Sequence, residues 1–370
     1  MKFKPETFLP PEATISAVLA YFNGKHPLPS PWQLQRPPTV ITKPWSTLYF
    51  LTIGTKQQQR QLVVKIMRFP DQATAAVSYQ SEELLLRGQH EYESLLRVYR
   101  HFLRQDDPHL RAVHPEAYLP DINALIMDFV PGQPLYDNNL SPRHLLSRQG
   151  MKQAMHMLQR CGKWLHWLHE LPVDNAPADR CFGPADSLAI LLEHVQQLRA
   201  CGVDLESWPL WQPTLTALQQ VSDDRQVWVH GDLHARNFFL LPDQSVVSMD
   251  TALDRLDSPY YDLGKLVADL KSRRARLLSL ATFPTPAMID ALSQAFLAGY
   301  FAGSQPEPLL LALYEGRFLL QKWLESLEAL RRTFNGRHAV WRIPVQRWIV
   351  NPTFYRIMAS WMVKINQTLH

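Results

Sequence analysis

The sequence predicts an α+β protein with two parts, a small antiparallel sheet with a helix followed by a larger, mainly helical part. Strand-like runs near the N-terminus occupy 39–42, 47–53 and 61–67. Long stretches of helical periodicity follow at 80–104 and 151–171, and the chain is mostly helical after residue 141. Its 370 residues are enough for two domains or for one large unit with two lobes.

The composition indicates a folded protein rather than a disordered one. Hydrophobic residues make up 46% of the chain and aromatic residues 11%, which is enough for sizeable cores. The formal net charge is +4, and the basic residues do not form one long patch with interleaved aromatics. We therefore expect no nucleic-acid partner.

The cysteines and the start of the chain bear on its location. Cys161, Cys181 and Cys201 are odd in number and lack metal-ligand spacing, which favours a reducing, cytoplasmic setting. The first residues are not followed by the apolar run of a signal peptide, and no window approaches the length of a transmembrane segment. The oligomeric state stays open.

The stretch 227–250 carries the chemistry. It reads as an apolar strand, a polar loop, a short strand, a turn and a strand that ends in an acid. Asp232 and Asn237 stand five residues apart in the loop, and Asp250 follows Asp232 by eighteen residues. Transfer of a phosphoryl group from a magnesium nucleotide needs a carboxylate to orient the acceptor hydroxyl, and oxygen ligands for the metal. We therefore assign Asp232 to the acceptor, and Asn237 and Asp250 to Mg²⁺. The alternative is a plain turn with Asn237 as a capping residue.

This stretch resembles a known family. His230-Gly-Asp-Leu-His-Ala-Arg-Asn237, with Met249-Asp250, is similar to the aminoglycoside phosphotransferase and choline kinase branch of the protein-kinase-like fold. Asp257-Ser-Pro-Tyr-Tyr-Asp262-Leu resembles that branch's Gly-Asp-Pro-x-x-Asp-Leu segment, except that Asp257 and Ser258 replace Gly and Asp. The resemblance implies a bilobal fold, with an N-terminal lobe at 1–130 and a helical C-terminal lobe at 131–370.

Lys65 is the candidate phosphate ligand of the small lobe. It is the only charged residue in an otherwise apolar strand, so its ammonium must either pair with an acid or extend to water. By resemblance it binds the α- and β-phosphates and pairs with a glutamate on the helix at 80–104. Glu91 and Glu93 both flank the apolar face of that helix, and Glu91 fits the family's Glu-x-x-x-Leu pattern better.

Two further segments are assigned to the nucleotide by resemblance. The turn 43–47 would cover the phosphates, with Ser46 and Thr47 in place of the usual glycines, although a plain hairpin fits this turn equally well. Backbone groups of Asp128, Phe129 and Val130, just before the Pro131-Gly132 turn, would hold the purine of ATP or GTP.

Several residues around the loop receive supporting roles. His230 is expected to fix the loop backbone, and by resemblance Asp262 braces the loop by hydrogen bonds while it also favours the start of a helix. His234 stands where protein kinases have a lysine, which points toward small-molecule acceptors. Arg236 is expected to be exposed, and His169 to have a packing or capping role with His166.

The sequence therefore predicts an ATP- or GTP- and Mg²⁺-dependent kinase of a small-molecule hydroxyl, on a sugar, an amino alcohol or an aminoglycoside-like compound. One alternative is a kinase of a lipid-linked or membrane-surface saccharide, with weak peripheral membrane contact through the basic clusters 271–276 and 331–337. Another is a pseudokinase that binds a nucleotide without catalysis. Binding to anionic liposomes and magnesium-dependent stabilisation by ATP distinguish the three hypotheses.

Overall fold

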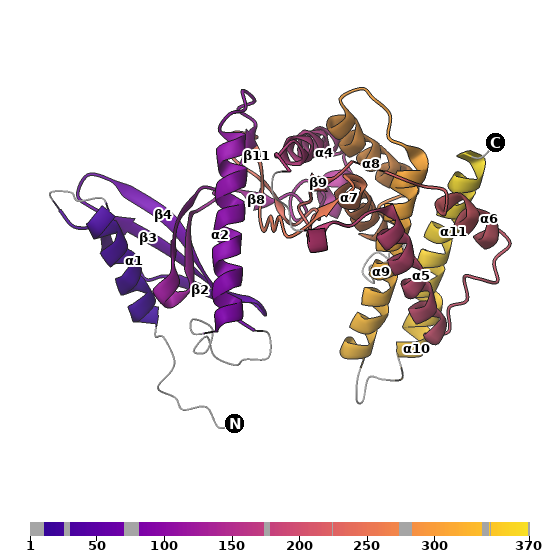
Figure 1. Ribbon diagram of the computed structural model, residues 1–370, viewed down its shortest axis with the longest axis horizontal. Helices are drawn as coiled ribbons and strands as arrows, with labels where there is room; N and C mark the ends of the chain where they lie inside the picture. The colour runs from indigo at the N-terminus through magenta and orange to yellow at the C-terminus, as the bar shows by residue number, and fades with distance from the viewer. Residues whose placement is uncertain are drawn as a thin grey trace. The chain divides into compact units, whose positions relative to one another are not determined.

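The computed structural model describes residues 11–25, 30–69, 81–173, 178–223, 225–273, 283–334, 340 and 342–368. The chain divides into two compact units. The first comprises Met1–Asp106 and Arg111–Pro131, and the second comprises Asp107–Leu110 and Gly132–His370. Figure 1 traces the elements of each unit in chain order.

The first unit is built on an antiparallel sheet with the strand order β1-β3-β4-β7-β6, and β2 pairs with β3. Its strands are β1 (Gln33–Leu34), β2 (Thr39–Thr42), β3 (Ser46–Gly54), β4 (Gln59–Met67), β6 (Pro115–Leu119) and β7 (Ala124–Asp128). Two helices accompany the sheet, α1 (Pro11–Lys25) and α2 (Glu82–Phe102). The predicted strands and helix of this region are therefore present, with ends shifted by a few residues.

The two helices pack on opposite faces of this sheet. Side chains alternate along a strand, so Leu62, Val64 and Ile66 of β4 share one face. These three residues lie in one buried cluster with Val18 and Phe22 of α1. The intervening residues of β4, including Lys65, therefore face α2.

A tight turn precedes β7. A short 3₁₀ helix, Pro120–Ile122, comes first, and Asn123 adopts a left-handed conformation with φ of 47°. Asparagine tolerates this conformation better than most residues, so the turn at Asn123 costs little conformational free energy. Strand β7 starts directly after it.

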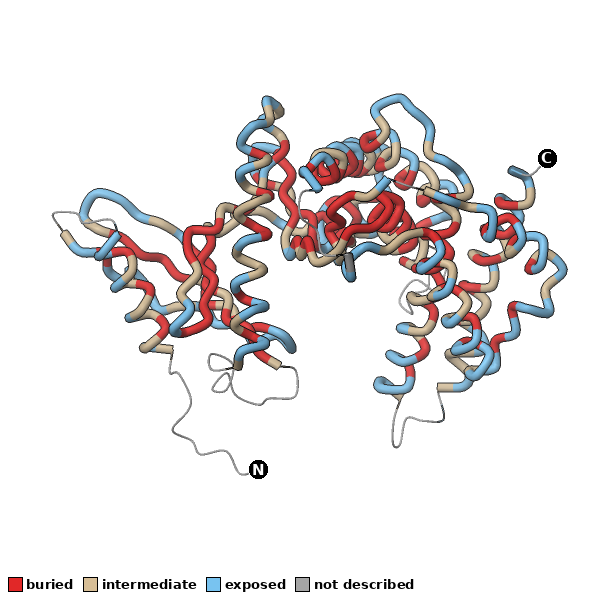
Figure 2. The backbone as a smooth tube through the Cα atoms, viewed as in Figure 1, coloured by how far each residue is buried: buried red, intermediate tan, exposed pale blue. Residues whose placement is uncertain are grey.

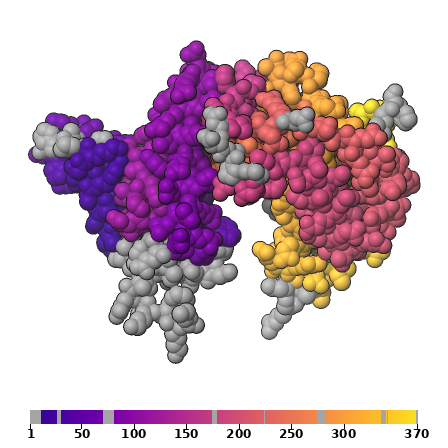
Figure 3. Space-filling model, viewed as in Figure 1, coloured from indigo at the N-terminus to yellow at the C-terminus, as the bar shows by residue number. Residues whose placement is uncertain are grey.

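The second unit is mainly helical. Its helices are α3 (Pro142–Leu145), α4 (Arg148–His169), α5 (Pro184–Ala200), α6 (Trp211–Leu218), α7 (Tyr260–Ser272), α8 (Pro286–Phe301), α9 (Pro308–Thr333), α10 (Arg342–Val345) and α11 (Asn351–Thr368), with a π-helical turn at Gln346–Val350. Helix starts follow local capping chemistry: the Ser147 and Thr285 side chains accept backbone N–H groups at the starts of α4 and α8. Helices α5 and α6 lie on the face shown in Figure 3.

Helix α7 lies at the centre of this unit. Most of its residues are buried, and it packs against both α8 and α9 (Figure 2). Short strands lie beside the helices: β5 (Leu110–Arg111), β8 (Gln133–Pro134), β10 (Phe238–Leu240) and β11 (Val246–Ser248) form a sheet of order β5-β11-β10-β8, and β9 (Val227–Trp228) pairs with β12 (Leu256–Asp257). These strands hold the two ends of the loop predicted to carry the chemistry.

Helices α4 and α8 cross closely because glycines face each other's backbones. A Cβ at Gly162 of α4 would collide with the Phe296 carbonyl, and one at Gly299 of α8 would collide with the Gln159 carbonyl. The crossing therefore depends on the absence of side chains at these two positions.

Replacing Gly299 with alanine is expected to destabilise the protein by about 1–3 kcal/mol, because the helices must separate to admit the methyl group. Urea unfolding measures this change. Gly24→Ala is the control, since a Cβ there meets nothing within 4 Å. Equal stability of the two variants would contradict the close crossing.

No helix in the described ranges combines the length and the apolar character needed to cross a bilayer. The basic clusters predicted at 271–276 and 331–337 lie partly outside these ranges, at 274–276 and 335–337. Trp348, which follows Arg347 further along the chain, is about 71% exposed.

Candidate active site

The predicted loop runs from His230 to Asn237 between β9 and β10, and its surrounding strands match the prediction for 227–250. Gly231 adopts φ of +82°, a left-handed conformation that side chains disfavour. A glycine is therefore needed immediately before Asp232, and the turn that it makes points the acid out of the strand.

Asp262, in the first turn of α7, holds this turn in place. It is fully buried, and it accepts hydrogen bonds from the backbone N–H groups of His230 at 2.6 Å and Gly231 at 3.2 Å. These are the bracing bonds expected for Asp262, and they satisfy two backbone donors that would otherwise be buried without a partner.

A buried histidine completes the surroundings of Asp262. Nε2 of His169 lies 3.1 Å from Asp262, and its Nδ1 lies 2.9 Å from the Tyr300 hydroxyl. Burial lowers the pKa of His169, so the ring is neutral, with Nε2–H donating to Asp262 and Nδ1 accepting from Tyr300. Burial acts to raise the pKa of Asp262, but the hydrogen bonds from His169 and the backbone lower it overall. His169 thus has a structural role beyond the packing that the sequence indicated.

Stability is expected to fall as the pH is lowered from about 7 to about 5. Burial lowers the pKa values of His169 and His230 below the ordinary 6.5. As the pH falls, these rings therefore take up protons in the unfolded chain before they do so in the folded protein. Burial raises the pKa of Asp257 to about 6, and its proton uptake in the folded protein offsets one histidine. The net difference of about one proton lowers stability by at most about 1.4 kcal/mol per pH unit. Urea unfolding at several pH values measures it, and a level or rising stability on acidification would contradict it.

His230 connects the loop to β11. The ring is fully buried, and its Nε2 lies 2.8 Å from the hydroxyl of Ser248. It also packs against Trp164 of α4. The structural role expected for His230 agrees with these contacts.

Asp232 differs from Asp262 because its carboxylate faces solvent, with about 60% of the side chain exposed. Nε2 of His234 lies 3.5 Å from one carboxylate oxygen, and the ammonium of Lys265 lies 3.0 Å from the other. The His234 ring and the Lys265 ammonium hold the pKa of Asp232 well below its usual range, and Lys265 is the nearer of the two. Nδ1 of His234 accepts the Arg236 N–H, so a neutral His234 presents Nε2–H to Asp232.

Lys265 is a residue that sequence reasoning missed. Its ammonium donates to the Gly231 carbonyl at 2.6 Å as well as to Asp232, and its side chain is only 13% exposed. Asp262, Lys265 and Asp269 follow one another at spacings of three and four, and therefore share a face of α7. All three contact the loop, since Asp269 accepts the Ala235 N–H at 3.3 Å. The spacing of three and four residues after Asp262 is the sequence feature that could have revealed Lys265.

Asn237 and Asp250 lie at adjoining ends of paired strands. Strands β10 and β11 pair Phe238 with Ser248, and the N–H of Met249 donates to the Asn237 carbonyl at 2.8 Å. The Asn237 amide nitrogen donates to the Asp232 carbonyl at 2.9 Å, so its oxygen is the atom left for a ligand. Asp250 is exposed and has φ of 56°, an uncommon conformation that aspartate adopts more readily than most residues.

These donors fit the magnesium ion that the sequence predicts. An amide oxygen and a carboxylate are hard oxygen ligands, and Mg²⁺ in nucleotide sites takes few protein ligands besides water and phosphate oxygens. Among the described residues there is no group of three or more His, Cys, Asp and Glu side chains that suits a metal. The fit therefore rests on the donor chemistry of Asn237 and Asp250.

In the first unit, Lys65 forms the ion pair expected for it. Its ammonium lies 2.5 Å from Glu91 of α2, and both side chains are mostly buried, at 13% and 15% exposure. Glu93 instead accepts from Gln89 on the exposed side of the helix. The geometry thus favours Glu91 over Glu93, as the family pattern did.

The turn assigned to the phosphates is a tight hairpin. The Lys43 N–H donates to the Ser46 carbonyl at 2.8 Å, and Thr42 pairs with Thr47 across the two strands. Ser46 and Thr47 are buried residues of β3, paired with Met67 and Ile66 of β4, rather than loop residues. This arrangement corresponds to the hairpin alternative.

The segment assigned to the purine follows β7. The N–H groups of Asp128 and Phe129 already donate to the carbonyls of His114 and Gln61, both at 3.0 Å. Val130 is the remaining N–H donor of the three predicted residues. The Asp128 carboxylate pairs with Arg60 at 2.6 Å and with His114 at 3.0 Å, so its side chain has a role within the sheet.

The predicted residues therefore fall into two groups. Asp232, Asn237 and Asp250 come together around one loop of the second unit, whereas Lys65 and Glu91 pair in the first unit. Ser46 and Thr47, at the start of β3, and Asp128 to Val130, at and just after the end of β7, also lie in the first unit.

The sequence profile of the phosphotransferase enzyme family matches residues 39–309. No curated protein matches the chain in sequence. An aminoglycoside phosphotransferase from Alicyclobacillus acidocaldarius is similar in structure over 99% of this chain and 98% of its own, with 14% identity and a TM-score of 0.53. A spectinomycin phosphotransferase in complex with AMP is similar over 95% of this chain and 97% of its own, with 12% identity and a TM-score of 0.50.

At these identities the structural similarity shows the fold alone, and it confirms the predicted kinase-like α+β class. The family profile covers more than half of the chain, including Lys65, the loop and Asp250. The chain therefore belongs to the phosphotransferase enzyme family.

Proposed function

We propose that the protein transfers the γ-phosphoryl group of ATP to a hydroxyl of a small molecule. The observation that carries this proposal is the loop of the second unit, where the exposed, ionised carboxylate of Asp232 belongs to the same strand–loop–strand segment as Asn237, whose amide oxygen is left for a ligand, and Asp250. Family membership supports the reaction class. The solved aminoglycoside and spectinomycin phosphotransferase structures support the fold, and they do not identify the acceptor of this chain.

Asp232 binds and orients the acceptor hydroxyl in this proposal. Its strongly lowered pKa makes it a weak base, which suits a loose transition state in which the hydroxyl proton leaves late. Orientation by Asp232 then matters more than its basicity. His234 and Lys265 fix the carboxylate, and Asp262 fixes the backbone that carries it.

The remaining assignments follow the same chemistry. Asn237 and Asp250 would hold Mg²⁺, which when bound neutralises charge on the phosphates. In the first unit, Lys65 binds the nucleotide phosphates, oriented by Glu91, and Val130 offers a backbone donor to the purine. We assign no phosphate contact to Ser46 or Thr47, because both lie within a strand.

Stabilisation by Mg–ATP tests the proposal. The wild-type protein is expected to unfold at a higher temperature with Mg²⁺ and ATP than with either alone, and to consume ATP when offered hydroxylated metabolites. Asp250→Ala is expected to lose the magnesium-dependent part of the shift. A wild-type protein without any magnesium-dependent shift would overturn the proposal, and binding without turnover of any acceptor would favour the pseudokinase alternative.

Lys265→Met is expected to lower kcat roughly 10- to 100-fold with little change in KM for ATP, because one charge-assisted hydrogen bond that positions Asp232 is lost. Steady-state ADP formation measures both constants. Lys265→Arg should retain more activity, since it keeps the charge, and Lys163→Met, on the exposed side of α4, is the control. An unchanged kcat in Lys265→Met would show that Asp232 is positioned without it.

A further inference from the structure

A cavity of about 390 Å³ lies beside the loop within the second unit. His234 and Arg236 line it from the loop, Asp269 from α7, and Lys322 and Glu325 from α9. His234 also contacts Asp232, so the cavity adjoins the carboxylate assigned to the acceptor hydroxyl. A volume of this size suits a small organic molecule.

The two acids of the cavity are already engaged. Glu325 accepts hydrogen bonds from Lys322 and Gln321, both at 2.9 Å, one at each carboxylate oxygen. Asp269 accepts the Ala235 N–H, and its charge also acts on the buried Arg273. An incoming ammonium group would therefore have to share either carboxylate with its existing partners.

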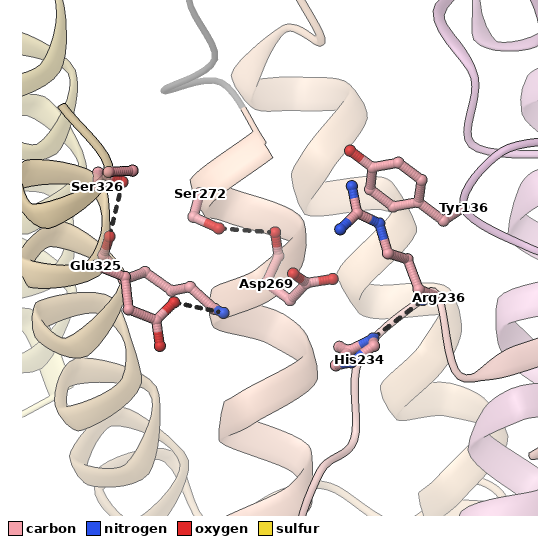
Figure 4. Close-up of a pocket in the computed structure, with 9 residues that line it drawn as sticks. Tyr136, His234, Arg236, Asp269, Ser272, Glu325 and Ser326 are labelled. Carbon is pink, nitrogen blue, oxygen red and sulfur yellow. Dashed lines mark hydrogen bonds and ion pairs between the residues drawn. The ribbon is translucent and has the colours of Figure 1, made fainter. Parts of the chain in front are cut away.

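Arg236 is the charge in the cavity that lacks such compensation. Its guanidinium lies over the ring of Tyr136, 4.4 Å from the centroid, and within the described part of the chain it has no carboxylate partner. Figure 4 shows the guanidinium alongside this ring on one wall, with Glu325 on the opposite wall. Its N–H donors remain available, because stacking on an aromatic face uses none of them.

The Tyr136 ring that holds Arg236 also carries a second cation. Arg273 lies against the same ring, 4.2 Å from the centroid, and donates to the Leu140 carbonyl at 2.6 Å. Its Nη1 is buried without a hydrogen-bond acceptor among the described residues. The Ala235 carbonyl accepts the Tyr136 N–H at 3.2 Å, which joins the Tyr136 backbone to the loop. Two guanidinium groups thus flank one ring.

We propose that this cavity binds the acceptor through an anionic group, a phosphate or a carboxylate, held by Arg236. The acceptor is then a hydroxylated organic anion rather than a polycationic aminoglycoside. A planar guanidinium offers paired donors that match the oxygens of either group. That the acceptor carries a hydroxyl rests on the proposed function. That it carries an anionic group rests on the charges of the cavity.

Protection of Arg236 from phenylglyoxal, followed by peptide mass spectrometry, tests the inference without turnover. The probes are glucose, glucosamine, glucose 6-phosphate and gluconate, which share a polyol and differ in charge. We expect the two anions to protect Arg236 at concentrations roughly 10- to 100-fold lower than glucose or glucosamine, as one charge-assisted contact implies. The better of the two anions identifies phosphate or carboxylate as the preferred group.

Two variants distinguish binding of anions at Arg236 from nonspecific electrostatic attraction to the protein surface. Arg236→Gln is expected to abolish the preference for anions in calorimetric binding, whereas Arg332→Gln, exposed on α9 outside the cavity, should keep it. Equal protection by glucose or glucosamine, or no protection by either anion up to its solubility limit, would overturn the inference. An anion preference that survives in Arg236→Gln would also overturn it.

The outcome is distinguishable from that of the proposed function. Absence of the magnesium-dependent stabilisation by ATP would contradict the proposed phosphotransferase reaction. The protection of Arg236 by anions would then still test the anion site by itself. Phosphorylation of glucosamine or of a neutral sugar in preference to the anions would uphold the reaction and overturn the anion site.

Discussion

Replacing Asp232 with asparagine is expected to lower the rate of phosphoryl transfer roughly 10²- to 10⁴-fold, the usual contribution of a positioned acid–base group. The amide keeps the size of the side chain but loses the charge that orients the acceptor hydroxyl and pairs with Lys265. ADP formation with a panel of hydroxylated acceptors measures the effect. Because about 60% of this side chain is exposed, stability should change by less than about 0.5 kcal/mol.

Asp254→Asn is the matched control for this variant. Asp254 is also an exposed acid, at 44%, and it forms an ion pair with the adjacent Arg255. It should retain wild-type turnover and wild-type stabilisation by Mg–ATP. If Asp232→Asn turned over as fast as this control, the assignment of Asp232 to the acceptor would be wrong.

Replacing Asp262 with alanine is expected to destabilise the second unit by about 3–5 kcal/mol, the cost of removing one partner from a buried charged network. The change leaves the N–H groups of His230 and Gly231 and the Nε2–H of His169 without their acceptor. Urea unfolding followed by tryptophan fluorescence gives the free energy of unfolding.

An exposed aspartate provides the comparison. Asp290 on α8 is 46% exposed and lies 3.5 Å from Lys364, so Asp290→Ala should cost less than about 1 kcal/mol. Hydrogen exchange of the Gly231 amide adds a local readout, since this N–H should exchange faster in Asp262→Ala. A loss of stability no larger than that of Asp290→Ala would mean that water or rearrangement replaces the carboxylate.

The part of the site that could be predicted from sequence is local. Asp232, Asn237 and Asp250 belong to one strand–loop–strand segment, so their spacing alone places them near each other. Lys65 requires a partner because it is a lone charge in an apolar strand, but the choice of Glu91 over Glu93 rested on the family resemblance.

The contacts that the sequence did not reveal join distant segments. His169 reaches Asp262 across 93 positions, and Tyr300 reaches His169 across 131. Lys265 looks like an ordinary helix lysine until the packing of α7 against the loop is known. The burial of Ser46 and Thr47 likewise depends on where the β2–β3 turn closes, and strand ends are weakly encoded by propensity.

The contacts of Asp262, Lys265 and Asp269 with the loop have a consequence for engineering. Inserting one residue into α7 before Asp262 would rotate this face by about 100° and remove all three contacts together. The loop and the helix are therefore a single transplantable module, although they are separated in sequence. A chimera that takes residues 230–237 from this chain without residues 260–272 should fold with a misplaced loop, whereas one that takes both should keep its geometry.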